Sequence, residues 1–359
     1  MTKIDMNSEL FVLRETTLRD SLKIINKTGE GILFVVDTHR LLLGTLTDGD
    51  IRRGLLAGTQ INDSIADIYN KKPFVFYEDE YSEETAKKII REMRYEAVPI
   101  LSSDGRVIAY EKWNQLLGKE ERKGPLKAID VPVIIMAGGK GTRMAPFTNV
   151  LPKPLIPVGE KTILELIIDS FKVHAVREYY FTVNYRAEMI QAYFNCIEKD
   201  YSVTYLREKE YLGTAGSLKL LPFKVAGTFI VSNCDIIVKA DFAEVMEFHK
   251  SSGAMLTVIS SIQHYKIPYG VVHFESGGIV SSLEEKPEYS FCINTGVYVL
   301  EHECLDYIPE GKMFHMTTLM EALMADGKKV ATYPINESEY IDVGQWEEYR
   351  NAVHILGGN

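Results

Sequence analysis

A glycine-rich turn directly after an apolar segment is the clearest chemical feature of the sequence. The apolar segment is Val131–Met136, and the turn reads Ala-Gly-Gly-Lys-Gly-Thr-Arg over residues 137–143. Glycines let the backbone approach an anion closely, and consecutive N–H groups can form an anion-binding nest. Lys140 is followed by Gly141 rather than by Ser or Thr, which excludes a Walker A loop, and Met144 replaces the third glycine of a dinucleotide-binding motif. An ordinary surface turn is the alternative for such a motif on its own.

The segments that must position this turn alternate between strand and helix patterns. Four short apolar runs predict buried strands: Val131–Met136, Tyr179–Val183, Thr228–Ser232 and Met255–Ser260. Thr162 and Glu165 form a Thr-x-x-Glu capping box before an apolar stretch, so a helix should begin there. Strands separated by helices indicate an α/β fold in which a mostly parallel sheet carries helices on both faces.

The first part of the chain contains a weak internal repeat. Lys-Ile-Ile occurs at residues 23–25 and again at residues 88–90, and each copy leads to an apolar strand candidate, Ile32–Val36 or Val98–Leu101. In the second copy, four apolar residues recur at helical spacing and predict one face of a helix: Ala86, Ile89, Ile90 and Met93. We therefore expect two β-α-β-type units packed as a pair.

A charged and polar stretch separates the two halves of the chain. Residues 119–125 read Lys-Glu-Glu-Arg-Lys-Gly-Pro, and the Gly-Pro pair interrupts regular structure. This composition is typical of a linker. We expect a paired module over residues 1–118, a linker over residues 119–130 and an α/β domain over residues 131–359.

Composition and charge narrow the class of protein. The chain has 359 residues, enough for about two domains, and its 46% hydrophobic and 25% charged residues are ordinary for a globular protein. Its net charge of −10 argues against a nucleic-acid partner, which needs a basic surface. The four cysteines form no C-x-x-C pair, so we expect free thiols in a reducing compartment. The sequence shows neither a signal-like nor a membrane-spanning segment, so we expect a cytoplasmic protein with no membrane partner.

Six motifs in a fixed order resemble the sugar-nucleotide pyrophosphorylases, which transfer a nucleotidyl group from a nucleoside triphosphate to a sugar 1-phosphate. They cover roughly residues 131–350 and read AGGKGTRM, LPKPLIPV, LGTAGSL, SNCDI, EEKP with NTGVYVL, and IDVG. The resemblance implies a Rossmann-like, glycosyltransferase-A-like nucleotidyltransferase domain. It also implies that a nucleoside triphosphate and a sugar 1-phosphate are the substrates and that pyrophosphate is released.

The implied reaction depends on positioning and charge neutralisation more than on proton transfer. The attacking oxygen belongs to a phosphate that is already anionic, so no general base is required. The site must instead hold two polyanions in line, with backbone donors, Lys, Arg and a divalent cation.

The resemblance assigns a role to each motif residue. Arg143 should stabilise the leaving pyrophosphate, Lys153 should bridge the reacting phosphates, and Lys286 should hold the sugar phosphate. Asp235 and Asp342 match the family's Mg²⁺ ligands, since carboxylate and phosphate oxygens suit this hard cation. The residues expected to bind the nucleotide are Ala137, Gly138, Gly139, Gly141, Thr142, Glu208, Gly213 and Thr214. The residues expected to contact the sugar are Gly270, Glu285 and Asn294.

Glu208 bears on the choice of nucleobase. In relatives that use uridine or thymidine triphosphate, the equivalent position is commonly Gln, whose amide both donates and accepts. An ionised carboxylate only accepts, and guanine presents two adjacent donors, N1–H and N2–H₂, that a carboxylate can bind together. Glu208 therefore favours GTP, and the Leu-Gly-Thr-Ala-Gly motif at residues 212–216 also occurs in relatives that use GTP and mannose 1-phosphate. A solvated glutamate in a charged loop is the alternative.

The N-terminal repeat resembles a pair of cystathionine-β-synthase (CBS) domains. Residues 44–50 match the G-x-x-[ST]-x-x-D ligand signature, in which Thr47 and Asp50 should hold the ribose of an adenosine nucleotide. The second unit places Tyr110, Trp113 and Leu116 at the corresponding positions, so its site should be closed or altered. A regulatory role in nucleotide sensing and a structural or dimerising role both remain open, and we expect a homo-oligomer.

Together, the two resemblances imply an enzyme of nucleotide-sugar synthesis. The favoured reaction is transfer of GMP from GTP to a hexose or aminohexose 1-phosphate, with Mg²⁺ as cofactor. Glucosamine 1-phosphate is the preferred acceptor, because the domain arrangement resembles guanylyltransferases that supply legionaminic acid or other surface sugars. A mannose-1-phosphate guanylyltransferase and a uridylyl-, thymidylyl- or cytidylyltransferase are the enzymatic alternatives. A non-catalytic sensor of adenosine nucleotides is the alternative outside the enzymes.

Overall fold

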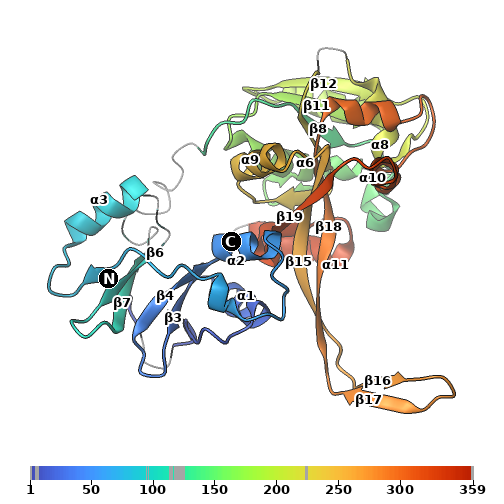
Figure 1. Ribbon diagram of the computed structural model, residues 1–359. Coiled ribbons are helices and arrows are strands. Elements are labelled where there is room, and N and C mark those ends of the chain that lie inside the picture. The colour runs from blue at the N-terminus through green and yellow to red at the C-terminus, as the bar shows by residue number, and fades with distance from the viewer. Residues whose placement is uncertain are drawn as a thin grey trace. The chain divides into compact units, whose positions relative to one another are not determined.

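The computed structural model describes residues 2–4, 8–93, 95, 97–112, 116, 126–222 and 225–356. The chain forms two compact units that are interleaved along the sequence. The first unit combines residues 1–124 with residues 262–292, and the second combines residues 125–261 with residues 293–359. We call residues 262–292 the arm. Figure 1 shows the helices and strands of both units.

A seven-stranded sheet forms the centre of the second unit. Its strands are β8 (Val133–Met136), β11 (Glu178–Val183), β12 (Ser202–Arg207), β13 (Phe229–Asn233), β15 (Leu256–Lys266), β18 (Glu288–Leu300) and β19 (Val330–Ile335). They lie in the order β12-β11-β8-β13-β18-β15-β19. Strand β8 pairs in parallel with both β11 and β13. The pairs β11–β12 and β15–β19 are also parallel, whereas β18 is antiparallel to β13. The mostly parallel α/β sheet expected from the sequence is confirmed.

Successive side chains of the central sheet face two separate apolar cores. On β8, Val133 and Ile135 belong to one core, whereas Ile134 and Met136 belong to the other. Because neighbouring side chains of a strand point to opposite faces, the sheet is covered on both sides. Helices α6 (Ile163–Lys172), α7 (Ala187–Cys196), α9 (Phe242–Ser252) and α11 (Trp346–Leu356) contribute to the first core. Helices α8 (Gly213–Gly216) and α10 (Met316–Ala325) contribute to the second.

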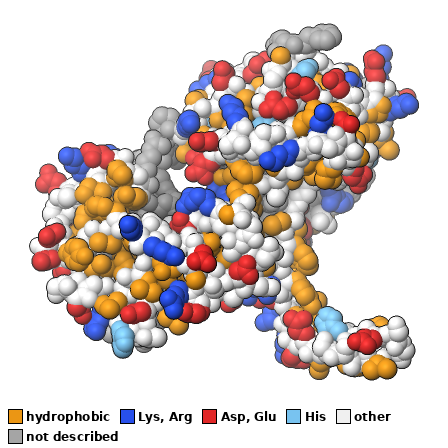
Figure 2. Space-filling model, in the orientation of Figure 1, with side chains coloured by type: hydrophobic (Ala, Val, Ile, Leu, Met, Phe, Trp, Pro, Cys, Tyr) orange, Lys and Arg blue, Asp and Glu red, His pale blue; other side chains and the backbone are white. Residues whose placement is uncertain are grey.

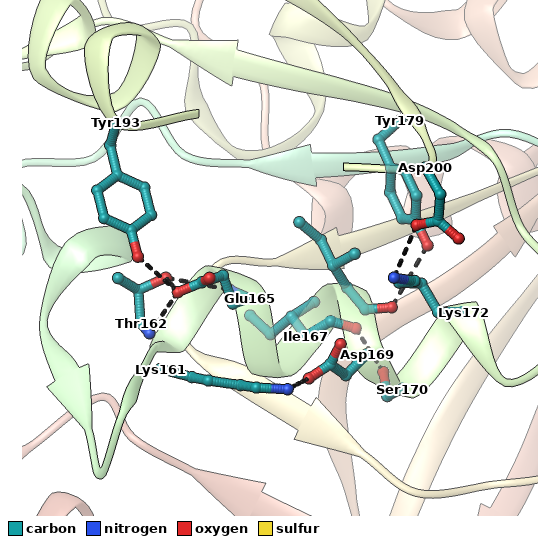
Figure 3. Close-up of polar contacts among 11 residues, drawn as sticks. Lys161, Thr162, Glu165, Ile167, Asp169, Ser170, Lys172, Tyr179, Tyr193 and Asp200 are labelled. Carbon is teal, nitrogen blue, oxygen red and sulfur yellow. Dashed lines mark hydrogen bonds and ion pairs between the residues drawn. The ribbon is translucent and has the colours of Figure 1, made fainter. Parts of the chain in front are cut away.

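The start of α6 shows how the sequence sets a helix boundary (Figure 3). The Glu165 N–H donates to Thr162 Oγ1 at 3.2 Å, and the Thr162 N–H donates to Glu165 Oε2 at 2.8 Å. This reciprocal capping box confirms the one predicted from the spacing of these two residues. Tyr193 of α7 donates to the same Glu165 oxygen at 2.8 Å, so the cap also joins two helices.

Shorter elements complete the second unit. Two small antiparallel pairs are present, β9 (Pro157–Val158) with β10 (Lys161–Thr162) and β14 (Ile236–Val238) with β20 (Tyr340–Asp342). The pairing of β14 with β20 sets Ile236 opposite Asp342, so the residue before Ile236 lies near Asp342. Short 3₁₀ helices occur at Thr142–Met144, Phe147–Asn149, Lys153–Leu155, Ser217–Leu220, His302–Tyr307 and Glu337–Glu339.

The N-terminal part of the first unit contains two similar repeats. The first consists of β2 (Phe11–Val12), α1 (Leu18–Thr28), β3 (Ile32–Val36) and β4 (Leu42–Thr47), followed by α2 (Asp48–Leu56) and a 3₁₀ turn (Ile65–Asp67). The second consists of β5 (Phe76–Tyr77), α3 (Glu83–Met93), β6 (Ala97–Leu101) and β7 (Val107–Lys112), and β1 (Thr2–Lys3) pairs with β7. In each repeat the first strand is parallel to the second, which is antiparallel to the third. The predicted internal repeat is confirmed.

The apolar face predicted for α3 is confirmed only in part. Ala86 and Ile90 are buried, but 59% of Met93 is exposed. Met93 is the last residue of α3, so its side chain lies where the helix leaves the core. Trp113 and most of the expected linker, residues 119–125, lie outside the described residues. Ile129, at the other end of that expected linker, is buried in a core of the second unit.

The arm continues β15 and β18 and ends in a two-stranded antiparallel hairpin. The hairpin pairs β16 (Val271–Phe274) with β17 (Val280–Glu284). Val272 lies opposite Leu283, and Phe274 lies opposite Val280. All four of these side chains are at least half exposed, and Figure 2 shows apolar side chains on the surface of the arm.

Two further expectations concern cysteines and membranes. None of the four cysteines, all of which lie in the described ranges, forms a disulfide, as predicted: Cys196, Cys234, Cys292 and Cys304. Among the helices of the described ranges, none combines the length and the apolar character that crossing a membrane requires.

Candidate active site

A pocket of about 580 Å³ opens at the carboxyl ends of β8, β11 and β13 in the second unit. Ligands commonly bind at this edge of a parallel sheet, because the loops that follow neighbouring strands meet there. Ten of the predicted site residues line the pocket: Gly138, Gly139, Gly141, Thr142, Arg143, Lys153, Glu208, Gly213, Thr214 and Asp235. Ala137 lies beneath it, fully buried, and donates its N–H to the Thr182 carbonyl at 2.9 Å.

The glycine-rich turn owes its shape to two crowded glycines. Gly141 has φ +64°, and a Cβ there would lie only 2.9 Å from Lys153 Cβ. A Cβ on Gly138 would lie 2.6 Å from Glu208 Oε1. Gly141 therefore requires glycine, because its backbone is left-handed and Lys153 Cβ leaves no room for a side chain, whereas a methyl group at Gly138 would press on the end of the Glu208 side chain. Gly139 is different, because nothing lies within 4 Å of its Cβ position, and its backbone is open to the pocket.

Lys153 is a buried lysine in the pocket wall. Its Nζ donates to Asp235 Oδ2 at 2.5 Å and to the Gly344 carbonyl at 3.2 Å. Only 5% of the residue is exposed. Lysine is rarely buried to this extent unless it is paired, so the carboxylate is what holds the ammonium group in place.

Arg143 approaches the same carboxylate from the glycine-rich turn. Its Nη2 lies 3.9 Å from Asp235 Oδ2, and 63% of the side chain is exposed. At this distance the guanidinium makes an ion pair but no hydrogen bond to Asp235. Most of its donors therefore remain available to an anion in the pocket.

Asp235 and Asp342 form a pair of carboxylates around Gly344. A Cβ on Gly344 would lie 2.6 Å from Asp342 Oδ1 and 3.2 Å from Asp235 Oδ2. Burial raises the pKa of Asp342, and the negative charge of Asp235 raises it further. The hydrogen bond from the Gly344 N–H lowers this pKa and so opposes part of the rise. Such a pair suits a hard divalent cation, which favours the charged form of both carboxylates.

A complete metal site does not follow from the protein groups alone. Among the described residues, no group of three or more His, Cys, Asp and Glu side chains is placed to hold a metal ion. A cation bound by Asp235 and Asp342 would need further oxygen ligands, which water or phosphate groups can supply.

Glu208 is buried beneath the glycine-rich turn, with 4% of the residue exposed. Its Oε2 accepts the Leu212 N–H at 3.1 Å. Burial raises the pKa of Glu208, and hydrogen bonds from the Leu212 N–H and the Thr182 hydroxyl oppose that rise. The burial excludes the solvated glutamate that the sequence left as the alternative.

The loop that follows Glu208 is anchored on residues 314–316. Gly213 has φ +79°, and a Cβ there would lie 2.6 Å from the Phe314 carbonyl oxygen. Thr214 Oγ1 accepts the Met316 N–H at 2.9 Å. These contacts fix the loop at the wall of the pocket.

Several pocket residues were not among those to which the sequence assigned a role in binding or catalysis: Met136, Lys140, Thr182, Asn184, Tyr211, Asn233 and Cys234. Asn184 follows β11 directly and Asn233 ends β13, so their positions at the carboxyl edge of the sheet could have identified them. Asn184 Nδ2 donates to the Glu208 carbonyl at 3.0 Å. Burial raises the pKa of the Cys234 thiol to about 12, so this cysteine is no nucleophile at neutral pH.

The remaining predicted residues lie outside this pocket. On the arm, a Cβ on Gly270 would lie 3.1 Å from Glu285 Oε2, so these two residues are neighbours. Lys286 has φ +47°, which is uncommon for lysine, and its Nζ lies 3.8 Å from Glu285 Oε1. All three belong to the first unit. Asn294 belongs to the second unit, where it is exposed and accepts the Gly296 N–H at 2.9 Å.

The two candidate ligand residues of the N-terminal repeat cap a helix. The Thr47 hydroxyl donates to Asp50 Oδ2 at 2.7 Å, and the Asp50 N–H donates to Thr47 Oγ1 at 3.3 Å at the start of α2. Asp50 also pairs with Arg53. In the second repeat, Tyr110 is buried and its hydroxyl donates to Glu30 Oε2 at 2.8 Å.

Comparison with known families agrees with this architecture. Residues 132–357 match the nucleotidyl transferase family, and residues 2–57 match the CBS domain. The first match spans more than half of the chain and includes every residue that lines the pocket. The chain therefore belongs to the nucleotidyl transferase family, and it carries a CBS domain at its N-terminal end.

Curated relatives match about three fifths of the chain. The chain is 31% identical over 242 residues to the UTP–glucose-1-phosphate uridylyltransferase of Synechocystis sp., which covers 61% of this chain and 62% of the relative. It is 34% identical over 225 residues to the mannose-1-phosphate guanyltransferase of Schizosaccharomyces pombe, which covers 60% of this chain and 61% of the relative. The chain thus spans about three fifths of the length of these relatives.

A solved structure supports the fold. HddC from Yersinia pseudotuberculosis matches with a TM-score of 0.50 and 24% identity, covering 63% of this chain and 100% of that chain. At this identity the similarity concerns the fold and not the ligand.

Proposed function

We propose that this protein transfers GMP from GTP to a hexose or aminohexose 1-phosphate and releases pyrophosphate. The observation that carries the proposal is the convergence of Lys153, Arg143 and the glycine-rich turn in one pocket. Membership of the nucleotidyl transferase family supports the reaction class. The activities named for the two relatives support a sugar 1-phosphate as the acceptor.

The pocket residues would act by holding and neutralising phosphates. In the proposed reaction a sugar-phosphate oxygen forms a bond to the α-phosphorus of GTP, and the bond from that phosphorus to pyrophosphate breaks. The open backbone at Gly139 and the neighbouring N–H groups would bind the triphosphate. Lys153 would stabilise charge on the reacting phosphate, and Arg143 would stabilise the leaving pyrophosphate.

Asp235 and Asp342 are the residues that would hold Mg²⁺. The cation, when bound, would neutralise part of the triphosphate charge. Lys153 orients the Asp235 carboxylate through their 2.5 Å contact, and the Gly344 N–H orients Asp342. Both carboxylates are thus held in place by protein groups.

Glu208 is the proposed determinant of the nucleobase. Its carboxylate lines the pocket beside Gly138, and one of its oxygens already accepts the Leu212 N–H. A fixed carboxylate would accept the two adjacent donors of guanine better than the mixed donor and acceptor edge of uracil. UTP remains the competing donor, because a uridylyltransferase is among the relatives.

The acceptor site is proposed to involve the arm. Lys286 would hold the phosphate of the sugar, while Gly270, Glu285 and Asn294 would contact its ring. Glucosamine 1-phosphate is our first choice of acceptor, for the synthesis of legionaminic acid or another surface sugar. Mannose 1-phosphate is the second choice, which the guanyltransferase relative supports.

The N-terminal region is proposed to be regulatory or dimerising. We propose a CBS pair over residues 1–118, a linker over residues 119–130 and the transferase domain over residues 131–359. Thr47 and Asp50 would bind an adenosine nucleotide, although they already form the cap of α2. We further propose a cytoplasmic homo-oligomer without nucleic-acid or membrane partners.

A matrix of substrates tests this function. Each common nucleoside triphosphate is combined with glucosamine, mannose and glucose 1-phosphates, and pyrophosphate release is measured with and without Mg²⁺. The proposal predicts Mg²⁺-dependent release that is fastest with GTP. Faster release with UTP would reject guanylyl transfer, and no release with any pair would reject the enzyme in favour of a nucleotide-binding protein.

A further inference from the structure

We propose that Lys23 of α1 positions the arm through Glu288, the first residue of β18. The two N-terminal repeats of the first unit, from β1 to β7, which we call the N-terminal module, would thereby take part in binding the sugar phosphate. The inference rests on the proposed function for the identity of the ligand that the arm binds. Both residues belong to the first unit, although 265 positions separate them in the sequence. Figure 1 shows α1 and the long strands of the arm.

The contact between α1 and the arm is a short ion pair that is partly shielded from water. Lys23 Nζ lies 2.6 Å from Glu288 Oε2, with 36% and 26% of the two side chains exposed. Asp20, one turn earlier on α1, lies 3.9 Å from the same ammonium group and competes only weakly for it. Salt screens a partly buried pair less than an exposed one, so this pair can fix the base of the arm.

An apolar contact accompanies the ion pair on the other strand of the arm. Ile262 of β15 is 5% exposed and belongs to the same buried cluster as Leu22 and Ile25 of α1. The N-terminal module therefore engages both long strands of the arm, β15 through Ile262 and β18 through Glu288. Two contacts on two strands restrain rotation of the arm as well as translation.

Between these contacts the two strands are tied to each other. His264 Nδ1 of β15 lies 2.7 Å from Ser290 Oγ of β18. Burial lowers the pKa of His264, and the positive charges of Lys23 and Arg19 lower it further. The negative charge of Glu288 raises this pKa and so opposes part of the shift. The charges of Lys23 and Arg19 on α1 therefore act on His264 of β15 as well as on Glu288 of β18.

The position of Glu288 links this contact to the proposed acceptor residues. Glu288 is the first residue of β18, and only Pro287 separates it from Glu285 and Lys286 in the chain. A shift of Glu288 would be transmitted to Lys286 through two peptide units, and small misplacements of a charged group can lower the efficiency of a reaction strongly. Lys23 is therefore a positioning residue that acts through Glu288 and does not touch the substrate.

Kinetics of the full-length chain test the proposal. Lys23→Glu should raise KM for the sugar 1-phosphate roughly five- to tenfold, because it replaces an ion pair by a repulsion, while KM for GTP and kcat change less than about twofold. Lys23→Arg should behave like the unchanged protein, and the charge swap Lys23→Glu with Glu288→Lys should restore KM. The control is Lys27→Glu, on the same helix, whose partner Glu9 lies 2.5 Å away in an exposed pair off the arm.

Hydrogen exchange supplies a readout that does not depend on turnover. In Lys23→Glu, the amides of residues 262–266 and 288–292 should exchange faster than in the unchanged protein and in Lys27→Glu. Unchanged exchange of these amides in Lys23→Glu would overturn the proposal. Faster exchange in an active Lys23→Glu enzyme whose KM for the sugar 1-phosphate is unchanged would overturn it as well. If the unchanged protein turns over no sugar 1-phosphate, the proposed function fails, and the exchange rates alone then decide whether Lys23 holds the arm.

Discussion

Lys153 and Asp235 are 82 positions apart in the sequence, yet Lys153 Nζ lies 2.5 Å from Asp235 Oδ2 in the wall of the pocket. Only 6% and 16% of their side chains are exposed. Lys153 begins a 3₁₀ turn after Pro152, and Asp235 lies between β13, a strand of the central sheet, and β14, so the fold brings together two distant segments. Since each charge satisfies the other, removing either one leaves a poorly hydrated charge behind.

Replacement of Lys153 by alanine should abolish most of the turnover. Loss of a cation that stabilises the reacting phosphates should lower kcat by about 10²–10³-fold. It should also lower the free energy of unfolding by roughly 3 kcal/mol, because Asp235 loses its buried partner. Pyrophosphate release and chemical denaturation measure these two effects on the same variant.

The matched control is Lys161→Ala. Lys161 also forms a 2.6 Å ion pair, with Asp169, but 52% of its side chain is exposed (Figure 3). An exposed pair contributes at most about 1 kcal/mol, so this variant should keep both its activity and its stability. Unchanged turnover in Lys153→Ala would remove Lys153 from the mechanism.

Replacement of Gly141 by alanine should damage both the turn and the lysine beside it. The left-handed backbone alone costs an alanine about 1 kcal/mol, and the new methyl group would also press on Lys153 Cβ. Because Lys153 must move, we expect kcat to fall by about 10- to 100-fold. Thermal unfolding and pyrophosphate release provide the measurements.

Gly253→Ala separates the backbone effect from the steric one. Gly253 ends α9 with φ +63°, close to the value at Gly141, but nothing lies within 4 Å of its Cβ position. This variant should lose a similar amount of stability from the backbone while its kcat stays unchanged. Equal kinetics in the two variants would show that the crowding at Gly141 has no role.

Replacement of Glu208 by glutamine should weaken the preference for GTP over UTP. The amide keeps the size of the side chain and an oxygen for the Leu212 N–H, but it offers a donor where guanine needs an acceptor. We expect the ratio of kcat/KM for the two nucleotides to fall by about tenfold. Glu210→Gln, an exposed residue of the same loop, is the control and should leave the ratio unchanged. A constant ratio in Glu208→Gln would show that other residues select the base.

His249 should make the stability of the protein depend on pH. Its Nδ1 lies 2.7 Å from Thr257 Oγ1 and its Nε2 lies 3.0 Å from Glu301 Oε1. Burial lowers the pKa of His249, although the Glu301 carboxylate opposes part of this shift. The folded state therefore binds a proton less readily than the unfolded state, whose histidine titrates near pH ~6.5. The resulting stabilisation is complete above that pH and is lost as the pH falls toward the lowered value.

Thermal unfolding between pH 7.5 and pH 5 tests this dependence. The unchanged protein should lose stability over the acidic part of the range, and His249→Gln should lose less of it. His249→Gln should also start from a lower stability, by about 1–3 kcal/mol, because buried hydrogen bonds are broken. His273→Gln is the control, since 49% of that side chain is exposed. Parallel pH profiles for the unchanged protein and His249→Gln would contradict this role.

Local patterns in the sequence predicted much of the fold. The capping box of Thr162 and Glu165 and the apolar run that became β8 are encoded by near neighbours, so their prediction needed no tertiary information. The sequence placed the end of one strand at Ser260, whereas β15 continues to Lys266. Apart from Ser261, this extension lies in the arm, and the buried Ile262 stands there among mostly polar residues, so no apolar run marks the extension as a strand.

Site residues that belong to one continuous motif could be predicted from the sequence. Site residues that the fold brings together from distant segments were harder to predict. The glycine-rich turn was found from its own residues, whereas Asn184 and Asn233 belong to no motif and could be inferred only because each directly follows a strand predicted for the same parallel sheet. The burial of Glu208 likewise depends on its contact with Gly138, which is 70 positions away in the chain and has no local signature. Packing between distant segments therefore accounts for what the sequence patterns did not contain.

A crystal structure of the protein with GTP and Mg²⁺ tests the central claim most directly. The account predicts the triphosphate on the turn at residues 138–143, within contact of Arg143 and Lys153, and the guanine beside Glu208. Phosphates bound anywhere else on the protein would contradict it.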